Sequence, residues 1–173
     1  IIVGCFFYFA NRFKNSKFFI AKAFGLGILI CFPAGYLNTY VLQTFTNNNP
    51  INNALLIGFF AGGLVEELLK FFALLFYLPT QKKLKKFDIV IFALFISLGF
   101  AVYENFGYVF NPSGASFEIA FLRAFTAVPM HIFNGIIMGY FFEFYSKTGD
   151  NKFLGYTVLL PIILHGSYNF FVS

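Results

Sequence analysis

Five acids and histidines lie well inside long apolar stretches of this sequence, where ionisable groups are rare. They are three acids and both histidines: Glu66, Glu67, Glu104, His131 and His165. An ionisable group costs on the order of several kcal/mol in hydrocarbon and marks a functional site by default. A desolvated carboxylate can accept a proton from water and return it to a leaving amine, while a histidine donates to a developing oxyanion. These residue types therefore suit hydrolysis by activated water.

Four further polar residues accompany this set and are predicted to support it: Lys70, Asn105, Asn134 and Asn169. Lys70 follows Glu66 by four residues, which predicts an ion pair on one helix face. Asn134 and Asn169 follow the two histidines by three and four residues, so each histidine has an amide on a similar face. Arg123 is either a further site residue or an interfacial anchor.

Water could be activated in two ways, and the residues alone leave both open. In the metal-free scheme a glutamate takes the proton. In the other scheme a divalent ion, with zinc as the alternative cofactor, lowers the pKa of a bound water. Its expected ligands are Glu67, Glu104, His131 and His165. HExxH and GxSxG motifs are absent, and no aspartate lies within an apolar stretch, which argues against zincin, serine and paired-aspartate mechanisms.

The apolar stretches themselves predict the elements that hold these residues. The chain has 173 residues, 59% hydrophobic and 11% charged, against about 45–50% and 25% in soluble domains. This composition excludes a soluble or disordered chain, and with it a nucleic-acid partner despite the net charge of +5. The apolar runs cover residues 1–10, 18–43, 54–79, 89–110, 118–145 and 153–172.

Because a membrane-spanning helix needs about 20 apolar residues, these runs predict an all-α, polytopic transmembrane helical bundle of about six spans. We expect a single integral membrane domain over residues 1–173, with N-terminal spans in 1–53 and a catalytic core in 54–173. The chain starts at Ile1 without a methionine, so we expect its true N-terminus to be missing.

Basic residues predict the orientation of the bundle. The loops after the first, third and fifth runs hold nine of the 12 Lys and Arg residues, and the alternate loops, 44–53 and 111–117, hold none. The positive-inside rule places the three basic loops in the cytoplasm. We therefore expect a multi-pass protein of the cell membrane whose C-terminus is extracytoplasmic.

The same topology predicts that the five ionisable residues share one depth. Glu66, Glu67 and His131 lie at the midpoints of their runs. At about 1.5 Å per residue, Glu104 lies about 7 Å and His165 about 4 Å towards the outer side. Four separate runs thus place an acid or an imidazole in one layer, which favours a common site slightly outside the membrane midplane.

Four motifs in order resemble the PrsW family of intramembrane proteases. They are Glu66, Glu67 and Lys70 (EExxK), Phe100, Glu104 and Asn105 (FxxxEN), His131 with Asn134, and His165 with Asn169 (HxxxN). The family is related to the CAAX endopeptidases and the CPBP, or ABI, membrane proteins, which have EExxxR and FxxxH. The resemblance covers residues 54–173 and implies a CPBP-like core in the third to sixth runs.

The resemblance implies an intramembrane endopeptidase that cleaves single-span membrane proteins, such as anti-sigma factors, near the extracytoplasmic side in regulated intramembrane proteolysis. It favours the glutamic, metal-free scheme without a cofactor, and leaves open which of Glu66 and Glu67 faces the water. An ion-coupled transporter is the main alternative, because intramembrane acids and histidines also form proton relays. A non-catalytic scaffold or immunity-type membrane protein is the third.

Overall fold

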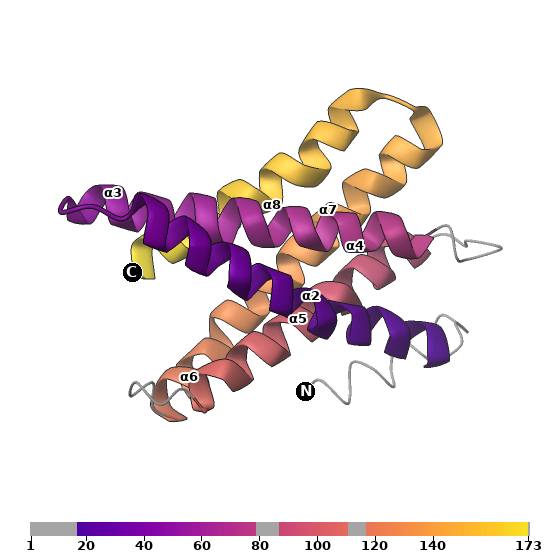
Figure 1. Cartoon of the computed structure of the whole chain (residues 1–173). Coiled ribbons are helices and arrows are strands. Elements are labelled where there is room, and N and C mark those ends of the chain that lie inside the picture. Colours follow the sequence, from indigo (N-terminus) through magenta and orange to yellow (C-terminus); the bar gives the residue numbers. More distant parts are fainter. Residues whose placement is uncertain (1–16, 79–86, 111–116, 173) are drawn as a thin grey trace.

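The computed structural model describes residues 17–78, 87–110 and 117–172, with the side chain of residue 17 left out. Every regular element in these ranges is a helix (Figure 1). The elements are α2 (Lys17–Phe45), α3 (Pro50–Leu55), η1 (Leu56–Glu66), α4 (Glu67–Tyr77), α5 (Asp88–Val109), α6 (Phe117–Phe125), α7 (Ala127–Thr148) and α8 (Asn151–Val172). The all-helical fold predicted from the apolar runs is confirmed.

Three stretches within the described ranges are long and apolar enough to cross a membrane: Phe18–Phe45, Asp88–Val109 and Phe117–Thr148. They coincide with three of the predicted runs. Two more runs fall in the helical segment α3–η1–α4 and in α8, and the run 1–10 lies outside the described residues. The chain is a membrane protein, and its number of spans stays a prediction.

The predicted run 118–145 is divided by a break at Thr126, which separates α6 from α7. Pro129 gives a physical reason. It has no N–H to donate to the carbonyl group of Phe125, and its ring disfavours a helix that continues across that point. Proline is tolerated in the first turn of α7, where the N–H groups have no partner within the helix.

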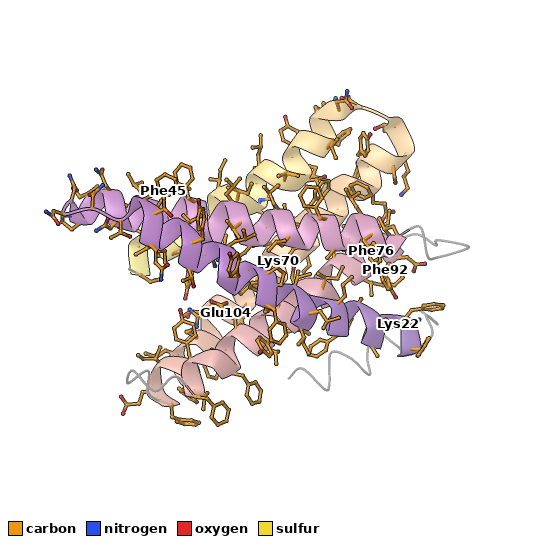
Figure 2. All side chains as sticks on the ribbon, in the orientation of Figure 1. Lys22, Phe45, Lys70, Phe76, Phe92 and Glu104 are labelled. Atoms are coloured by element: carbon orange, nitrogen blue, oxygen red, sulfur yellow. The ribbon has the colours of Figure 1, made fainter. Side chains whose placement is uncertain are left out.

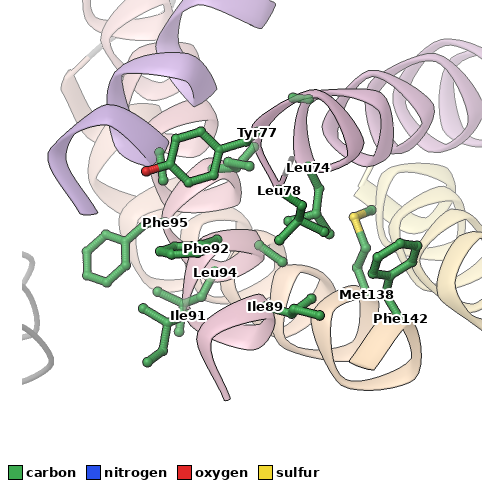
Figure 3. Packing of buried hydrophobic residues seen from close by; sticks show 14 of the residues in the cluster. Leu74, Tyr77, Leu78, Ile89, Ile91, Phe92, Leu94, Phe95, Met138 and Phe142 are labelled. Carbon is green, nitrogen blue, oxygen red and sulfur yellow. The ribbon is translucent and has the colours of Figure 1, made fainter. Parts of the chain in front are cut away.

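Helix α5 lies between α2 and α7 at the centre of the bundle, and α8 packs against α7 and η1. In the apolar window of α5, 67% of the residues are buried, against 28% in α2. Figure 1 shows α2 crossing α5, with α7 and α8 forming an antiparallel hairpin. The aliphatic and aromatic core that joins α4, α5 and α7 is shown in Figure 3.

Two glycine contacts allow close helix crossings. A Cβ atom built on Gly27 of α2 would meet the carbonyl group of Ile96, and one on Gly99 of α5 would meet the carbonyl group of Phe24. Glycine at both positions therefore lets α2 and α5 touch through their backbones, as small residues do in membrane helix pairs.

The segment η1 is π-helical over its 11 residues and leads directly into α4. A Cβ atom built on Gly63 of η1 would lie 2.9 Å from the carbonyl oxygen of Ile162 on α8. π-Helical turns are rare and occur frequently at functional sites. This one ends at Glu66, so it determines how the two adjacent glutamates are presented.

Candidate active site

Helical segments from across the chain bring acids and histidines into one buried cluster. The η1–α4 segment supplies two acids and a lysine, while α5, α7 and α8 supply one residue each. The cluster consists of Glu66, Glu67, Lys70, Glu104, His131 and His165. Figure 2 labels Lys70 and Glu104, which enter it from α4 and α5. All members except Glu104 are at most 5% exposed.

Glu67 connects three helices through one carboxylate oxygen. Its Oε1 atom lies 2.8 Å from Lys70 Nζ and 2.7 Å from His165 Nδ1. Asn134 Nδ2 on α7 is 3.5 Å away. Glu67 is 0% exposed. Its contact with the Nδ1 atom of His165 indicates that the proton of a neutral His165 ring lies on Nδ1, which leaves Nε2 as an acceptor.

A second chain of contacts runs through His131. Lys70 Nζ lies 2.9 Å from His131 Nδ1, and His131 Nε2 lies 3.0 Å from Glu104 Oε2. An ammonium group can only donate, so His131 Nδ1 accepts and its Nε2 carries the proton that is donated to Glu104. Arg123 Nη2 contacts the other oxygen of Glu104 at 2.7 Å. Both ring nitrogens of His131 are therefore engaged.

Glu66 is held differently from the other two acids. Asn38 Nδ2 on α2 donates to Glu66 Oε1 at 3.1 Å. Glu66 Oε2 is buried and has no hydrogen-bond partner in the described part of the chain. His165 Nε2 lies 3.9 Å from this oxygen. Glu66 also lines a cavity of about 610 Å³ between α2 and α5.

The charges of the cluster do not balance. Lys70 pairs with Glu67, and Arg123 pairs with Glu104. Glu66 has no fixed cation within hydrogen-bond distance in the described residues, since its contact with Lys70 Nζ is 4.0 Å long. A buried carboxylate without a close counter-charge is costly. Glu66 is thus the acid of the cluster most ready to accept a proton or a cation.

The predicted ion pair of Glu66 with Lys70 is the weaker of two contacts. Lys70 lies closer to Glu67, at i+3, than to Glu66, at i+4. Helical spacing allows both pairs. The nearby ring of His131 and the ring of Phe100, 4.3 Å from Lys70 Nζ, hold the ammonium group close to Glu67.

The supporting amides occupy different places. Asn134 contacts Glu67 and also donates to the Pro161 carbonyl group at 3.3 Å. Asn169 lies beside His165 where both face Gly62, because a Cβ atom on Gly62 would meet both side chains. Asn105 points away from the cluster and donates to the carbonyl group of Ala120 on α6 at 3.0 Å.

Two further residues join the site, one that the sequence left open and one that it missed. Arg123, which the sequence left as an anchor or a site residue, binds Glu104 and stacks over the Tyr108 ring at 3.8 Å. Asn38 is not evident from the sequence, because a single amide in an apolar run carries little signal. The shared helix face of Asn38, Gly35 and Leu42 was the one available hint.

Three side chains offer donor atoms close enough to hold a metal ion. Ligand atoms of Glu66, His131 and His165 all lie within 4.8 Å of one another. The predicted ligand set differs, since it contained Glu67 and Glu104 in place of Glu66. In the structure these two acids are paired with Lys70 and Arg123.

The comparison with protein families gives an independent result. The family model described as "PrsW family intramembrane metalloprotease" matches residues 15–173. The proteins named "Protease PrsW" of Bacillus subtilis and Oceanobacillus iheyensis are 30% and 33% identical, over 97% and 96% of this chain and 76% and 75% of their own lengths.

The protein of the same name in Clostridioides difficile is 32% identical over 89% of this chain and 65% of its own length. No solved structure is significantly similar to the chain, so the likeness of its core to CPBP proteins stays a prediction. The match covers nearly the whole chain and includes the segments that supply the cluster. This membrane protein therefore belongs to the PrsW family of intramembrane proteases.

Proposed function

We propose that the chain hydrolyses peptide bonds of single-span membrane proteins, with anti-sigma factors as the expected class, near the extracytoplasmic side of the cell membrane. The observation that supports this most directly is the unbalanced carboxylate of Glu66. It combines a buried, unpartnered oxygen with a histidine acceptor 3.9 Å away and a cavity at its side. Such a site suits the activation of a water molecule in a nonpolar environment.

Glu66 is the proposed general base. A water that binds between Glu66 Oε2 and His165 Nε2 loses a proton to Glu66 as its oxygen bonds to the substrate carbonyl carbon. The proton then passes to the amide nitrogen as the C–N bond breaks, so water and peptide yield a carboxylic acid and an amine, and transfer of the acid's proton to the amine gives carboxylate and ammonium. Glu67 holds His165 in the required tautomer through Nδ1, as carboxylates that accept a hydrogen bond from a functional histidine do.

The developing oxyanion needs donors that are already in place. Asn169 is proposed for this role, because its side chain lies beside His165 on the same face of α8. His131 donates its proton to Glu104 and thereby orders the acid on α5. Lys70 holds both Glu67 and His131. The remaining cluster thus positions the two groups that touch water.

A metal-assisted form of the reaction would place the ion between Glu66, His131 and His165, where it would lower the pKa of a bound water. Glu66 Oε2 and His165 Nε2 fit this purpose, and Glu67 supports His165 as carboxylates support metal-bound histidines. His131 does not fit in the observed geometry. Lys70 donates to its Nδ1, so Nε2 carries a proton and is occupied by Glu104. This contact supports the metal-free scheme.

The proposed topology agrees with the cleavage side. With basic loops in the cytoplasm, α2 and α5 both run outward. The cavity lies along their second halves, from Cys31 to Leu42 and from Phe100 to Tyr108. Six spans, with the C-terminus outside, complete this proposal.

The test uses purified chain in liposomes with a panel of single-span proteins. The panel includes a designed reporter, an oligo-leucine span whose outer end carries a Gly-Ser segment. We expect cleavage by the wild-type chain and a loss of at least about 100-fold in Glu66→Gln, which keeps the shape of the side chain but cannot take the proton. Equal cleavage by Glu66→Gln, or solute uptake without cleavage, would contradict the proposal.

A further inference from the structure

The cavity beside Glu66 has two helical walls of different character. Its volume is about 610 Å³, within the range of about 300–1,000 Å³ typical of ligand pockets. The α2 wall is formed mostly by small and polar residues, among them Gly35, Asn38 and Thr39, and the α5 wall carries the aromatic residues Tyr103 and Tyr108. This space is large enough for a short peptide segment.

The α2 wall is a single helix face. Cys31, Gly35, Asn38 and Leu42 follow at intervals of four, three and four residues and all line the cavity. A Cβ atom on Gly35 would meet nothing within 4 Å. The missing side chain at Gly35 therefore enlarges the cavity and is not needed for contact between helices.

Asn38 links this wall to the cluster. Its Nδ2 atom donates to Glu66 Oε1, which fixes the carboxylate and leaves Oε2 free on the other side. Its Oδ1 atom is buried and has no partner in the described residues. A buried amide oxygen without a donor is costly, so the position suits an N–H group that arrives from outside.

We infer that the cavity between α2 and α5 is the cleft that binds the substrate, as a locally unwound peptide, and that Asn38 is a positioning residue for Glu66 and for the substrate backbone. This inference rests on the proposed function and adds to it the route, the substrate conformation and a residue of α2. An N–H group of the substrate bonds to Asn38 Oδ1, while the neighbouring carbonyl carbon faces the water at Glu66.

The requirement for unwinding follows from backbone chemistry. Within a helix each peptide carbonyl is bonded to an N–H group four residues away, and water cannot reach its carbon. An unwound peptide in the membrane needs new partners for its polar groups. Asn38 Oδ1 offers an acceptor, and Thr39 Oγ1, which donates to the Gly35 carbonyl group at 2.8 Å, keeps its lone pairs. Substrates with glycine or serine at the outer end of the span therefore fit best.

Glycine-to-leucine variants test the cleft. Gly35→Leu and Gly107→Leu fill it from the α2 and α5 walls, since both residues line it and neither added Cβ meets an atom within 4 Å. Gly25→Leu is the matched control: its Cβ is equally free, and it lines a different groove of α2. With the oligo-leucine reporter, we expect kcat/KM to fall at least about tenfold in the first two variants and to stay within about twofold in the control.

Variants of Asn38 test its positioning role. Asn38→Leu keeps the approximate shape and removes both polar atoms, so we expect kcat to fall at least about tenfold and KM to rise. Asn38→Asp keeps an acceptor and loses the donor to Glu66, so kcat should fall while KM stays within about twofold. A purely structural role would reduce the yield of folded protein and leave both constants of the folded fraction unchanged.

Photo-crosslinking measures binding of the reporter in the absence of catalysis. Benzoylphenylalanine replaces Tyr103, which lines the cavity, or Tyr36, which is 75% exposed and does not line it. In the Glu66→Gln background we expect at least about fivefold more crosslinked reporter from position 103 than from position 36, because only the former faces the cleft.

The possible outcomes separate the two proposals. If the wild-type chain cleaves the reporter while Gly35→Leu and Gly107→Leu retain activity, or if position 36 crosslinks as well as position 103, the cleft assignment is wrong and the protease assignment stands. If the reporter is bound at position 103 and never cleaved, the cleft is supported and the proposed function fails.

Discussion

Lys70 is fully buried and holds together residues of three helices. It contacts Glu67 on its own helix and His131 on α7, and it lies against the Phe100 ring on α5. A lysine at this depth is tolerated only because its charge is offset locally. The same ammonium group fixes which nitrogen of His131 carries the proton. Stability and protonation state at the site are therefore set by one side chain.

A double-mutant cycle checks this coupling. Lys70→Met leaves Glu67 without its cation and is expected to lower the free energy of unfolding by about 3–5 kcal/mol. Adding Glu67→Gln removes the unpaired charge and should recover part of the loss, which gives a non-zero coupling energy. Thermal unfolding in detergent measures both. Lys22→Met, at an exposed position, is the control and should change stability by less than about 0.5 kcal/mol.

Removal of metal distinguishes the two schemes at His131. Because its Nε2 proton is donated to Glu104, we expect full activity after prolonged treatment with a chelator. Elemental analysis should find no stoichiometric metal. One equivalent of zinc per chain, with activity lost on removal and restored on addition, would overturn the metal-free scheme. A metal site at this position requires His131 Nε2 to lose its contact with Glu104 and to bind the ion instead.

At the scale of elements, the crossing of η1 with α8 positions the two glutamates relative to His165. The two segments approach so closely that Gly63 has no room for a side chain beside the Ile162 carbonyl group. Any displacement of α8 from η1 lengthens the contact between His165 and Glu67, now 2.7 Å. The geometry of the site thus depends on backbone packing as well as on the polar residues.

Gly63→Ala is expected to separate these segments. The added Cβ would lie 2.9 Å from a backbone oxygen that cannot move aside, so we expect a loss of stability of about 1–3 kcal/mol together with reduced cleavage. Gly155→Ala on α8 is the matched control, because its Cβ meets nothing within 4 Å. It should leave stability unchanged or raise it by up to about 1 kcal/mol, as alanine favours a helix over glycine.

At the scale of the whole molecule, orientation decides which leaflet the cleft faces. With Cys5 and Cys31 replaced by serine, a single cysteine at Gly149 should react with an impermeant maleimide only from the cytoplasmic side. A cysteine at Val172 should react only from outside. The expectation follows from the positions of the basic loops. The reverse labelling would place the cleft in the inner leaflet and contradict cleavage near the extracytoplasmic side.

Much of this molecule could be predicted from one sequence, and the missing parts have physical causes. The helices and the cluster follow from apolar runs and from the cost of charge in them, which single residues such as Glu104 and His131 display clearly. The partner of Lys70 was predicted less well, because i+3 and i+4 contacts are equally available on a helix. The choice depends on rings that come from other helices.

Asn38 and the break at Thr126 were missed for a different reason. No other polar residue lies at helical spacing from Asn38 within its apolar run. Its contact with Glu66 joins residues 28 apart on separate helices. A run of apolar residues also hides a break, since hydropathy does not register the missing N–H of Pro129. Contacts between helices and the hydrogen-bonding limits of the backbone lie outside what periodicity encodes.

During translation, α4 is synthesised before α7 and α8, which supply its histidine partners. His131 follows Lys70 by 61 residues, and His165 follows Glu67 by 98. A lone charge at the centre of a helix raises the free energy of insertion into a bilayer by about 2.5–3.5 kcal/mol. Glu67 and Lys70 enter as opposite charges 2.8 Å apart on one helix turn, so each offsets the other while the rest of the chain is still being made. The nascent helix therefore carries a counter-ion for Glu67, and the later histidines dock onto a Glu67–Lys70 pair that is already formed.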